Sequence, residues 1–417
     1  LLIIISLLII IPQINNIQYP NSTITSKLMF FIYTCLIIVG IFIISVLGSK
    51  TKTIHLSKLD IILLTLLAYI TLNRYMIQPN VGFSIRYLEL LGLGVIYIVL
   101  RNVPSKSYIW LLLAIIISGI VQAVYGNLQL LDYYPSNHSG FKLTGSFFNP
   151  GPYAGFLTAV WPIALGLYLF KEISSKQLES QISSTSNLIH RIRVYVIEYI
   201  PMLGCISIIL VLPATHSRAS WIAVLLSSIV LIEMRYHILK GILKRLSLIK
   251  KTTLIVVSVG IVSIGLLGVY HFKKGSSDGR LFIWKVTTEI VKDHPVFGVG
   301  FDRFKAHYMN YQADYFDSHG ETKETLVADN TYYAFNEGLQ FITENGLIGL
   351  VLLVFLVYYM FKIRVNKEYT HIYLLSVNGL LAIGVFALFS YPMQILPIKL
   401  ILVVLLAQLA NLDSNKQ

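Results

Sequence analysis

Two arginines have the chemistry and the placement to hold a phosphate group. Arg218 follows Thr215-His216-Ser217 at the end of an apolar run, and Arg280 lies at the start of a predicted helix. A guanidinium offers a rigid fork of N–H donors for paired phosphate oxygens, and a helix N-terminus adds free N–H groups and a favourable dipole. The simpler interpretations are an interfacial arginine for Arg218 and a surface pair with Asp278 for Arg280. Together, on one side of a membrane, the two arginines predict a pyrophosphate clamp.

Two further polar residues stand where apolar runs begin or end. Arg86 precedes Glu89 by three residues, a spacing that favours an ion pair within one helix over direct contact with a substrate. Asn149 lies in Gly145-Ser146-Phe147-Phe148-Asn149-Pro150-Gly151, just before an apolar helix. Its side chain can cap that helix or hydrogen-bond a sugar.

The longest polar stretch, residues 271–342, is predicted to contain two short helices. The first runs from Ser277 or Asp278 to about Val291 and carries Arg280 and Trp284 in its first turns. The second begins at Asp302 and places Phe304, Tyr308, Tyr311 and Tyr315 on one face. This face can stack on sugar rings or pack against the rest of the loop.

Several common chemistries have no support in the sequence. The histidines form neither HxxxH nor HExxH, so no metal site is expected. Neither a phosphate-binding GxxxxGK[ST] loop nor a GxSxG motif is present. The sequence calls for no cofactor.

The elements that position these residues are membrane helices. The chain has 417 residues, 55% hydrophobic and only 13% charged, whereas soluble domains carry about 25% charged residues. We therefore predict an all-α polytopic membrane protein with about twelve transmembrane helices. The predicted spans are 1–11, 28–47, 59–76, 83–100, 107–126, 152–170, 194–214, 219–234, 252–270, 343–361, 373–390 and 395–412.

The distribution of Lys and Arg predicts the orientation. More than half of the 33 basic residues fall in alternate loops, which should face the cytoplasm. Both termini then lie in the cytoplasm, and residues 271–342 form a large periplasmic loop between the ninth and tenth spans of a single integral membrane domain, 1–417. The net charge of +13 is explained by this topology and by anionic lipid, so no nucleic-acid partner is expected.

The ordered set of motifs resembles the superfamily of O-antigen ligases, O-antigen polymerases and pilin-type oligosaccharyltransferases. The matching pieces are Thr144–Pro150, Ser217-Arg218-Ala219, Gly279-Arg280 with Trp284, Asp293-His294-Pro295 with Gly298-Val299-Gly300, and Asn336–Gln340 with Glu344 and Gly346–Leu350. The resemblance implies a C-type glycosyltransferase architecture in the bacterial inner membrane. It also implies glycan transfer from undecaprenyl pyrophosphate on the periplasmic face, without a metal ion, and Arg218 and Arg280 match the family's pyrophosphate-binding arginines.

One position departs from the family pattern. Where relatives carry a histidine before the motif asparagine, this chain has Phe335 before Asn336. Phenylalanine takes no proton, so the base must come from elsewhere, or transfer depends on stabilising the leaving group and positioning the substrates. Glu337, Asp329 and His319 are the candidate substitutes, and Glu337 is preferred because it is adjacent to the motif.

These observations predict a transferase whose acceptor is a lipid A-core hydroxyl. An O-unit acceptor (polymerase) or a protein hydroxyl (O-oligosaccharyltransferase) fits the sequence as well. From another class, a lipid-linked glycan transporter or an inactive, binding-only member remains open.

Overall fold

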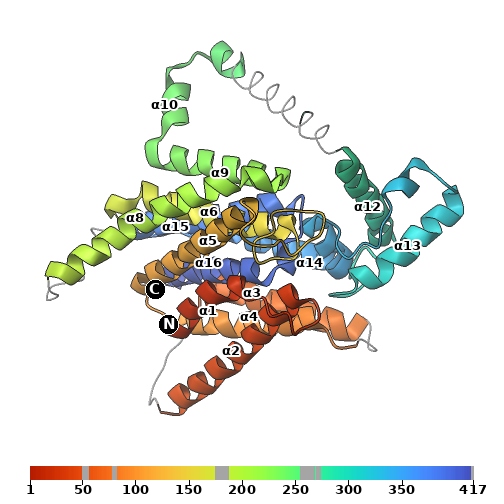
Figure 1. Ribbon diagram of the computed structural model, residues 1–417, viewed down its shortest axis with the longest axis horizontal. Coiled ribbons are helices and arrows are strands. Elements are labelled where there is room, and N and C mark those ends of the chain that lie inside the picture. Colours follow the sequence, from red (N-terminus) through yellow and green to blue (C-terminus); the bar gives the residue numbers. More distant parts are fainter. Residues whose placement is uncertain (49–55, 78–81, 174–186, 254–267, 269–273, 415–417) are drawn as a thin grey trace. The chain divides into compact units, whose positions relative to one another are not determined.

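The structure is a computed structural model, and it describes residues 1–48, 56–77, 82–173, 187–253, 268 and 274–414 (Figure 1). Its described part is built from helices and connecting loops. The helices are α1 (Leu2–Ile10), α2 (Ser22–Leu47), α3 (Lys58–Leu72), α4 (Ile85–Arg101), α5 (Tyr108–Leu130), α6 (Pro150–Leu169), α8 (Asn187–Val211), α9 (Arg218–Tyr236), α10 (Ile238–Arg245), α12 (Lys274–Asp293), α13 (Phe304–His319), α14 (Glu337–Lys362), α15 (Thr370–Ala387) and α16 (Leu396–Ser414).

Within these residues, nine helices are long and apolar enough to cross a membrane. They correspond to nine of the twelve predicted spans, which supports a polytopic membrane protein. Of the other three, 1–11 forms a shorter apolar helix. The span predicted at 83–100 is the 17-residue α4, which carries Arg86, Glu89 and Arg101. The span predicted at 252–270 falls almost entirely outside the described residues.

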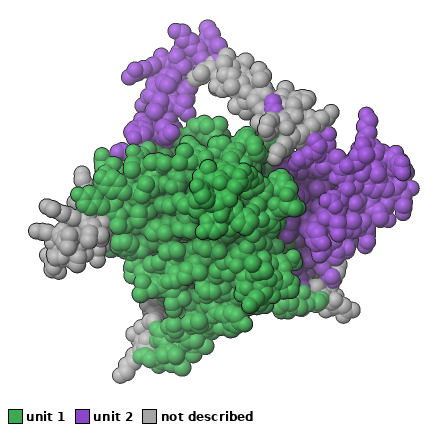
Figure 2. Space-filling view, viewed as in Figure 1, with its two compact units in different colours: residues 1–67, 82–231, 353–417 green, residues 68–81, 232–352 purple. Residues whose placement is uncertain are grey.

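The chain divides into two compact units (Figure 2). Unit 1 comprises Leu1–Leu67, Gly82–Leu231 and Leu353–Gln417, and unit 2 comprises Ala68–Val81 and Ile232–Leu352. Unit 1 contains most of the membrane helices. Unit 2 contains most of the polar stretch identified in the sequence.

Unit 1 is organised around α6 and α16, in whose spans 83% and 89% of residues are buried. Small residues bring neighbouring helices close together: an added Cβ at Gly155 would lie 2.5 Å from the Phe386 ring of α15, and one at Gly119 of α5 would lie 2.6 Å from Val160. Close backbone approach of this kind is typical of membrane helices, where van der Waals packing replaces the hydrophobic effect. The scaffold that carries Arg86, Asn149 and Arg218 is therefore tightly packed.

Two buried carboxylates of unit 1 are paired with basic side chains, as hydrocarbon requires. Glu89 of α4 forms an ion pair with Lys399 of α16. Asp60 forms an ion pair with Arg101 at 2.8 Å and accepts a hydrogen bond from the Tyr97 hydroxyl at 2.6 Å. The pair predicted between Arg86 and Glu89 is wrong, because Glu89 is bound across helices instead.

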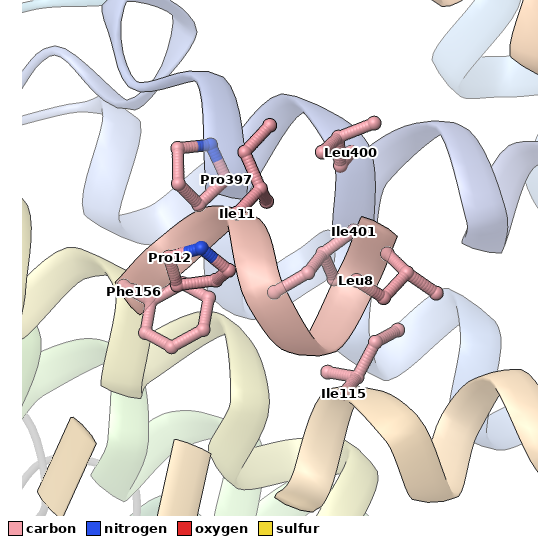
Figure 3. A pocket seen from close by; sticks show the side chains of 8 residues that line it. All are labelled: Leu8, Ile11, Pro12, Ile115, Phe156, Pro397, Leu400 and Ile401. Atoms are coloured by element: carbon pink, nitrogen blue, oxygen red, sulfur yellow. The ribbon is translucent and has the colours of Figure 1, made fainter. Parts of the chain in front are cut away.

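Unit 1 also contains a small apolar pocket beside α1, with about 180 Å³ of empty space. Figure 3 shows the side chains that line it, which are Leu8, Ile11, Pro12, Ile115, Phe156, Pro397, Leu400 and Ile401. These side chains carry no polar group that could orient a glycan or a phosphate. We therefore do not place the functional site there.

Unit 2 has its own hydrophobic core between α12 and α13. Phe282, Val286 and Ile290 of α12 meet Phe304 and Tyr308 of α13, together with Val299 and Ala334. The apolar side chains recur at helical spacing on both helices, so each buries one face against the other. This core holds the polar stretch as a folded subdomain that we call the outer subdomain, residues 274–345.

Helix α14 is interrupted at Gly346, whose φ of 63° and ψ of −168° are non-helical. The segment 295–300 fills the interruption. Val299 and Gly300 donate their N–H groups to the carbonyls of Thr343 and Glu344, both at 2.9 Å, and Leu347 donates to the Pro295 carbonyl at 2.9 Å. The backbone groups released by the break are thus satisfied within unit 2, which is a condition for irregular backbone at membrane depth.

Candidate functional site

The residues of the last motif form a fixed turn at the start of α14. Phe335 has φ +50°, a left-handed conformation that costs a non-glycine residue about 1–3 kcal/mol and persists only where its surroundings impose it. The surroundings do so on both sides. The Trp284 indole N–H donates to the Ala334 carbonyl at 2.9 Å, and the Ala334 N–H donates to Gln340 Oε1 at 3.1 Å.

Asn336 caps α14. Its Oδ1 accepts the N–H of Leu339 at 3.0 Å, the usual bond of an N-cap asparagine. The capped end still directs the first free N–H groups and the positive end of the helix dipole outward. Asn336 therefore organises a site suited to an anion.

Arg280 lies against this turn. Its guanidinium carbon is 5.3 Å from the centre of the Phe335 ring, and Trp284 stands one helical turn further along α12, on the same face. The contact is a cation–π interaction between the guanidinium and the ring. Phe335, at the position where the family pattern has a histidine, thus contacts Arg280.

The predicted position of Arg280 at a helix start is wrong. Helix α12 is described from Lys274, so Arg280 lies in its second turn, where backbone N–H groups are used within the helix. The helix N-terminus near Arg280 is that of α14.

The two candidate acids differ in exposure. Glu337 is the first residue of α14 and is only 9% exposed, at the end of a helix where a negative charge is favoured. Asp329 is exposed in the loop before the turn, and its Oδ1 accepts the N–H of Asn330 at 2.7 Å. Glu337 is therefore the acid more closely tied to the turn.

The prediction that Tyr308 binds a sugar is wrong, because Tyr308 belongs to the hydrophobic core of unit 2. It is fully buried, and its ring lies 5.4 Å from that of Phe304. Tyr311 and Tyr315 also pack in this core, so the aromatic face of α13 is the surface by which it packs on α12.

The histidines of the outer subdomain do not gather around a metal site; no cluster of His, Cys, Asp or Glu suited to a metal ion occurs among the described residues. His294 and His307 lie with ring centres 6.0 Å apart. Burial, with help from His294 and Arg303, lowers the pKa of His307. His319 stacks on Tyr315 at the exposed end of α13, so it is a surface residue there.

In unit 1, Arg218 is the first residue of α9 and is half-buried. The turn before it includes His216 at φ +50°, and the Ser217 carbonyl accepts the first helical N–H, from Trp221 at 3.1 Å. Further along, α9 is fixed by Trp161 and Asn378, which bond to Ser228 and to the Ser227 carbonyl at 2.8 and 3.0 Å.

Asn149 and Arg86 also lie at helix starts of unit 1. Asn149 caps α6 by accepting the N–H of Gly151 at 3.0 Å, which favours the capping interpretation. Arg86 is the second residue of α4, after the cap Ser84, and stays half-buried.

Sequence reasoning missed two residues that hold the outer subdomain. Asn73 begins a short π-helix, η2 (Asn73–Ile77), and donates to the Phe297 carbonyl at 2.7 Å, and the Tyr69 hydroxyl donates to the Asn345 carbonyl at 2.6 Å. Both bind the region of the α14 interruption. The signal was a polar pair spaced by four residues in a mostly apolar span, which places both on one helix face.

The fold is that of a multi-pass membrane protein, and on a helical subdomain Arg280 lies beside the start of α14, which Asn336 caps. Residues 203–354, about a third of the chain, match the family model described as O-Antigen ligase. This match confirms the resemblance to the O-antigen ligase superfamily and covers Arg218, Arg280 and the α14 motif. The family indicates a glycosyltransferase-like enzyme of ligase or polymerase type that uses a lipid-linked glycan and an acceptor in a membrane. No curated protein matched the chain.

Proposed function

We propose that this protein is an O-antigen ligase-like glycosyltransferase of the bacterial inner membrane. It would move a glycan from undecaprenyl pyrophosphate to a lipid A-core hydroxyl on the periplasmic face, with both termini in the cytoplasm. The observation that carries the proposal is the placement of Arg280 over Phe335, next to the capped start of α14. The family match adds the reaction class.

In the proposed reaction the acceptor oxygen attacks the anomeric carbon of the glycan. The bond between that carbon and the pyrophosphate oxygen breaks, and undecaprenyl pyrophosphate leaves with the electron pair. Negative charge grows on the leaving group, so Arg218 and Arg280 would stabilise the transition state more than the ground state. Glu337 would accept the hydroxyl proton as it is lost.

The two arginines lie in different units, Arg218 in unit 1 and Arg280 in unit 2. The proposal gives each arginine a role in its own setting. Each stands in or beside a helix start, Arg218 on α9 and Arg280 beside α14. The motif order from Ser217-Arg218 to Gly279-Arg280 supports the proposal.

The test is the surface glycan of a deletion strain, compared with strains that express the wild-type protein or Arg280→Ala. We expect lipid A-core without its long glycan, with undecaprenyl-linked polymer accumulating, and rescue by the wild-type protein alone. Single-unit caps would identify a polymerase instead. Intact lipopolysaccharide with under-glycosylated secreted proteins would identify a protein O-oligosaccharyltransferase.

One observation favours a transporter as a second candidate. Transporters often build their sites at interrupted membrane helices, and α14 is interrupted at Gly346. Here the interruption is filled by backbone bonds to residues 295–300. A deletion strain in which undecaprenyl-linked glycan accumulates only on the cytoplasmic face would support the transporter.

A further inference from the structure

The burial of the α13 tyrosines leaves the glycan without the aromatic surface that the sequence predicted. Glycan-binding sites commonly present an aromatic ring, because its apolar face covers the C–H face of a sugar while polar groups bind the hydroxyls. In the outer subdomain, Tyr332 is a ring that is both exposed and held by its backbone.

Tyr332 is held outward by the backbone on either side. Thr331 and Ala334 are buried, at 6% and 0% exposure, whereas Tyr332 is 44% exposed. The Thr331 hydroxyl bonds to the Asp329 carbonyl at 3.2 Å, and both backbone groups of Ala334 are bonded, to Gln340 and Trp284. A ring presented by an anchored backbone loses little conformational entropy when a ligand binds.

A cation lies beside this ring. Lys305, exposed in the first turn of α13, has its ammonium 4.1 Å from the centre of the Tyr332 ring. The ammonium holds one face of the ring by a cation–π contact and keeps N–H donors for hydroxyl groups. An apolar ring face and hydroxyl-binding donors thus occur together.

The position along the chain fits a sugar near the pyrophosphate. Tyr332 precedes Phe335, the ring under Arg280, by three residues, and three extended residues span at most about 10 Å. A ring at that distance from the pyrophosphate site can reach the first sugars of the glycan.

We propose that Tyr332 and Lys305 form a subsite for a pyranose ring of the lipid-linked donor. This inference rests on the proposed function, because it assumes that the pyrophosphate binds at Arg280.

The experiment measures binding of two probes to the full-length protein in lipid nanodiscs. One probe is undecaprenyl pyrophosphate, and the other is undecaprenyl pyrophosphate that carries an N-acetylhexosamine disaccharide. We expect the wild-type protein to bind the glycosylated probe more tightly, by about three- to ten-fold for one aromatic contact. Tyr332→Ala should remove this preference and leave the affinity for the bare carrier unchanged, Tyr332→Phe should retain it, and Lys305→Gln should reduce it.

The controls separate this inference from the proposed function. Leu326→Ala changes another exposed apolar residue of the same subdomain, 89% exposed, and should keep the preference. Arg280→Ala should weaken the binding of both probes to the same extent. If Arg280→Ala bound the bare carrier as tightly as the wild-type protein does, the proposed pyrophosphate site at Arg280 would be contradicted. A wild-type preference that survives in Tyr332→Ala, or the absence of any preference in the wild type, would overturn the subsite while leaving the Arg280 site standing.

Discussion

At the scale of single residues, Arg280 should matter most. Arg280→Ala should lower glycan transfer by about 10²–10³-fold, the usual cost of removing a group that stabilises developing charge, while protein level stays unchanged. Arg280→Lys should recover only part of the rate, because an ammonium lacks the paired donors. Lys292→Ala is the matched control on α12, since Lys292 is exposed and pairs with Glu289. Wild-type transfer by Arg280→Ala would refute the clamp.

Glu337 provides the second prediction at this scale. If it accepts the acceptor proton, Glu337→Gln should slow transfer by at least about tenfold, because a general base contributes about 10²–10⁴-fold. The measurement is the transfer rate of the variant and the wild-type protein under the same conditions. An unchanged transfer rate in Glu337→Gln would show that Glu337 has a structural role only. If Asp329→Asn lost transfer while Glu337→Gln kept it, Asp329 would be the base.

At the scale of elements, the interruption of α14 should be sensitive to one methyl group. A Cβ at Gly346 would lie 2.2 Å from the Val296 carbonyl oxygen, on a backbone with φ +63°. Gly346→Ala should therefore cost about 2 kcal/mol or more in stability, seen as a lower midpoint of thermal unfolding in detergent. Gly384→Ala on α15 is the control, because no atom lies within 4 Å of its added Cβ. Equal midpoints for the two variants would contradict this prediction, because they would show that residues 295–300 move to accommodate the methyl group at little cost.

The contact between α12 and α13 should respond to acid. The pKa of His307 is lowered from its ordinary value of 6.5 by burial, then by His294 and Arg303. The unfolded chain therefore binds the proton more readily than the folded chain. The contribution of His307 to the free energy of unfolding is therefore complete above pH 6.5 and is lost as the pH falls below that value. The thermal midpoint of His307→Gln should fall less than that of the wild type between pH 7 and pH 5; parallel curves would contradict this.

The same scale shows how far sequence reasoning reaches. Apolar length predicted nine spans that the structure contains, because burial in hydrocarbon leaves a direct compositional signal. Helical spacing identified the aromatic face of α13, yet spacing alone does not say whether solvent or α12 covers it. The interruption at Gly346 was not predicted, because it depends on residues 295–300, which are far away in the sequence. Arg280 was identified, but its neighbouring helix start was assigned to α12 and not to α14.

At the scale of the whole molecule, the orientation in the membrane is the open prediction. Leu326→Cys, at a position that is 89% exposed, should react with a membrane-impermeant maleimide in intact spheroplasts if residues 271–342 are periplasmic. The unmodified protein is the control, because Cys35 is buried and Cys205 half-buried. A label at a C-terminal cysteine should require permeabilised cells, and the reverse pattern would invert the topology.

The bonds that close the α14 interruption also mark a natural boundary for recombination. The Gly300 N–H donates to the Glu344 carbonyl at 2.9 Å. The two ends of the segment between these residues therefore lie next to each other. Such an insertion can be exchanged between proteins when the α12 face that packs against it, with Phe282, Val286 and Ile290, is kept. Residues 301–343 form a cassette that contains Tyr332, Phe335 and Glu337 but neither arginine of the clamp. If the donor binds as we propose, we expect exchange of this cassette between related enzymes to change which glycan is accepted while the carrier stays the same.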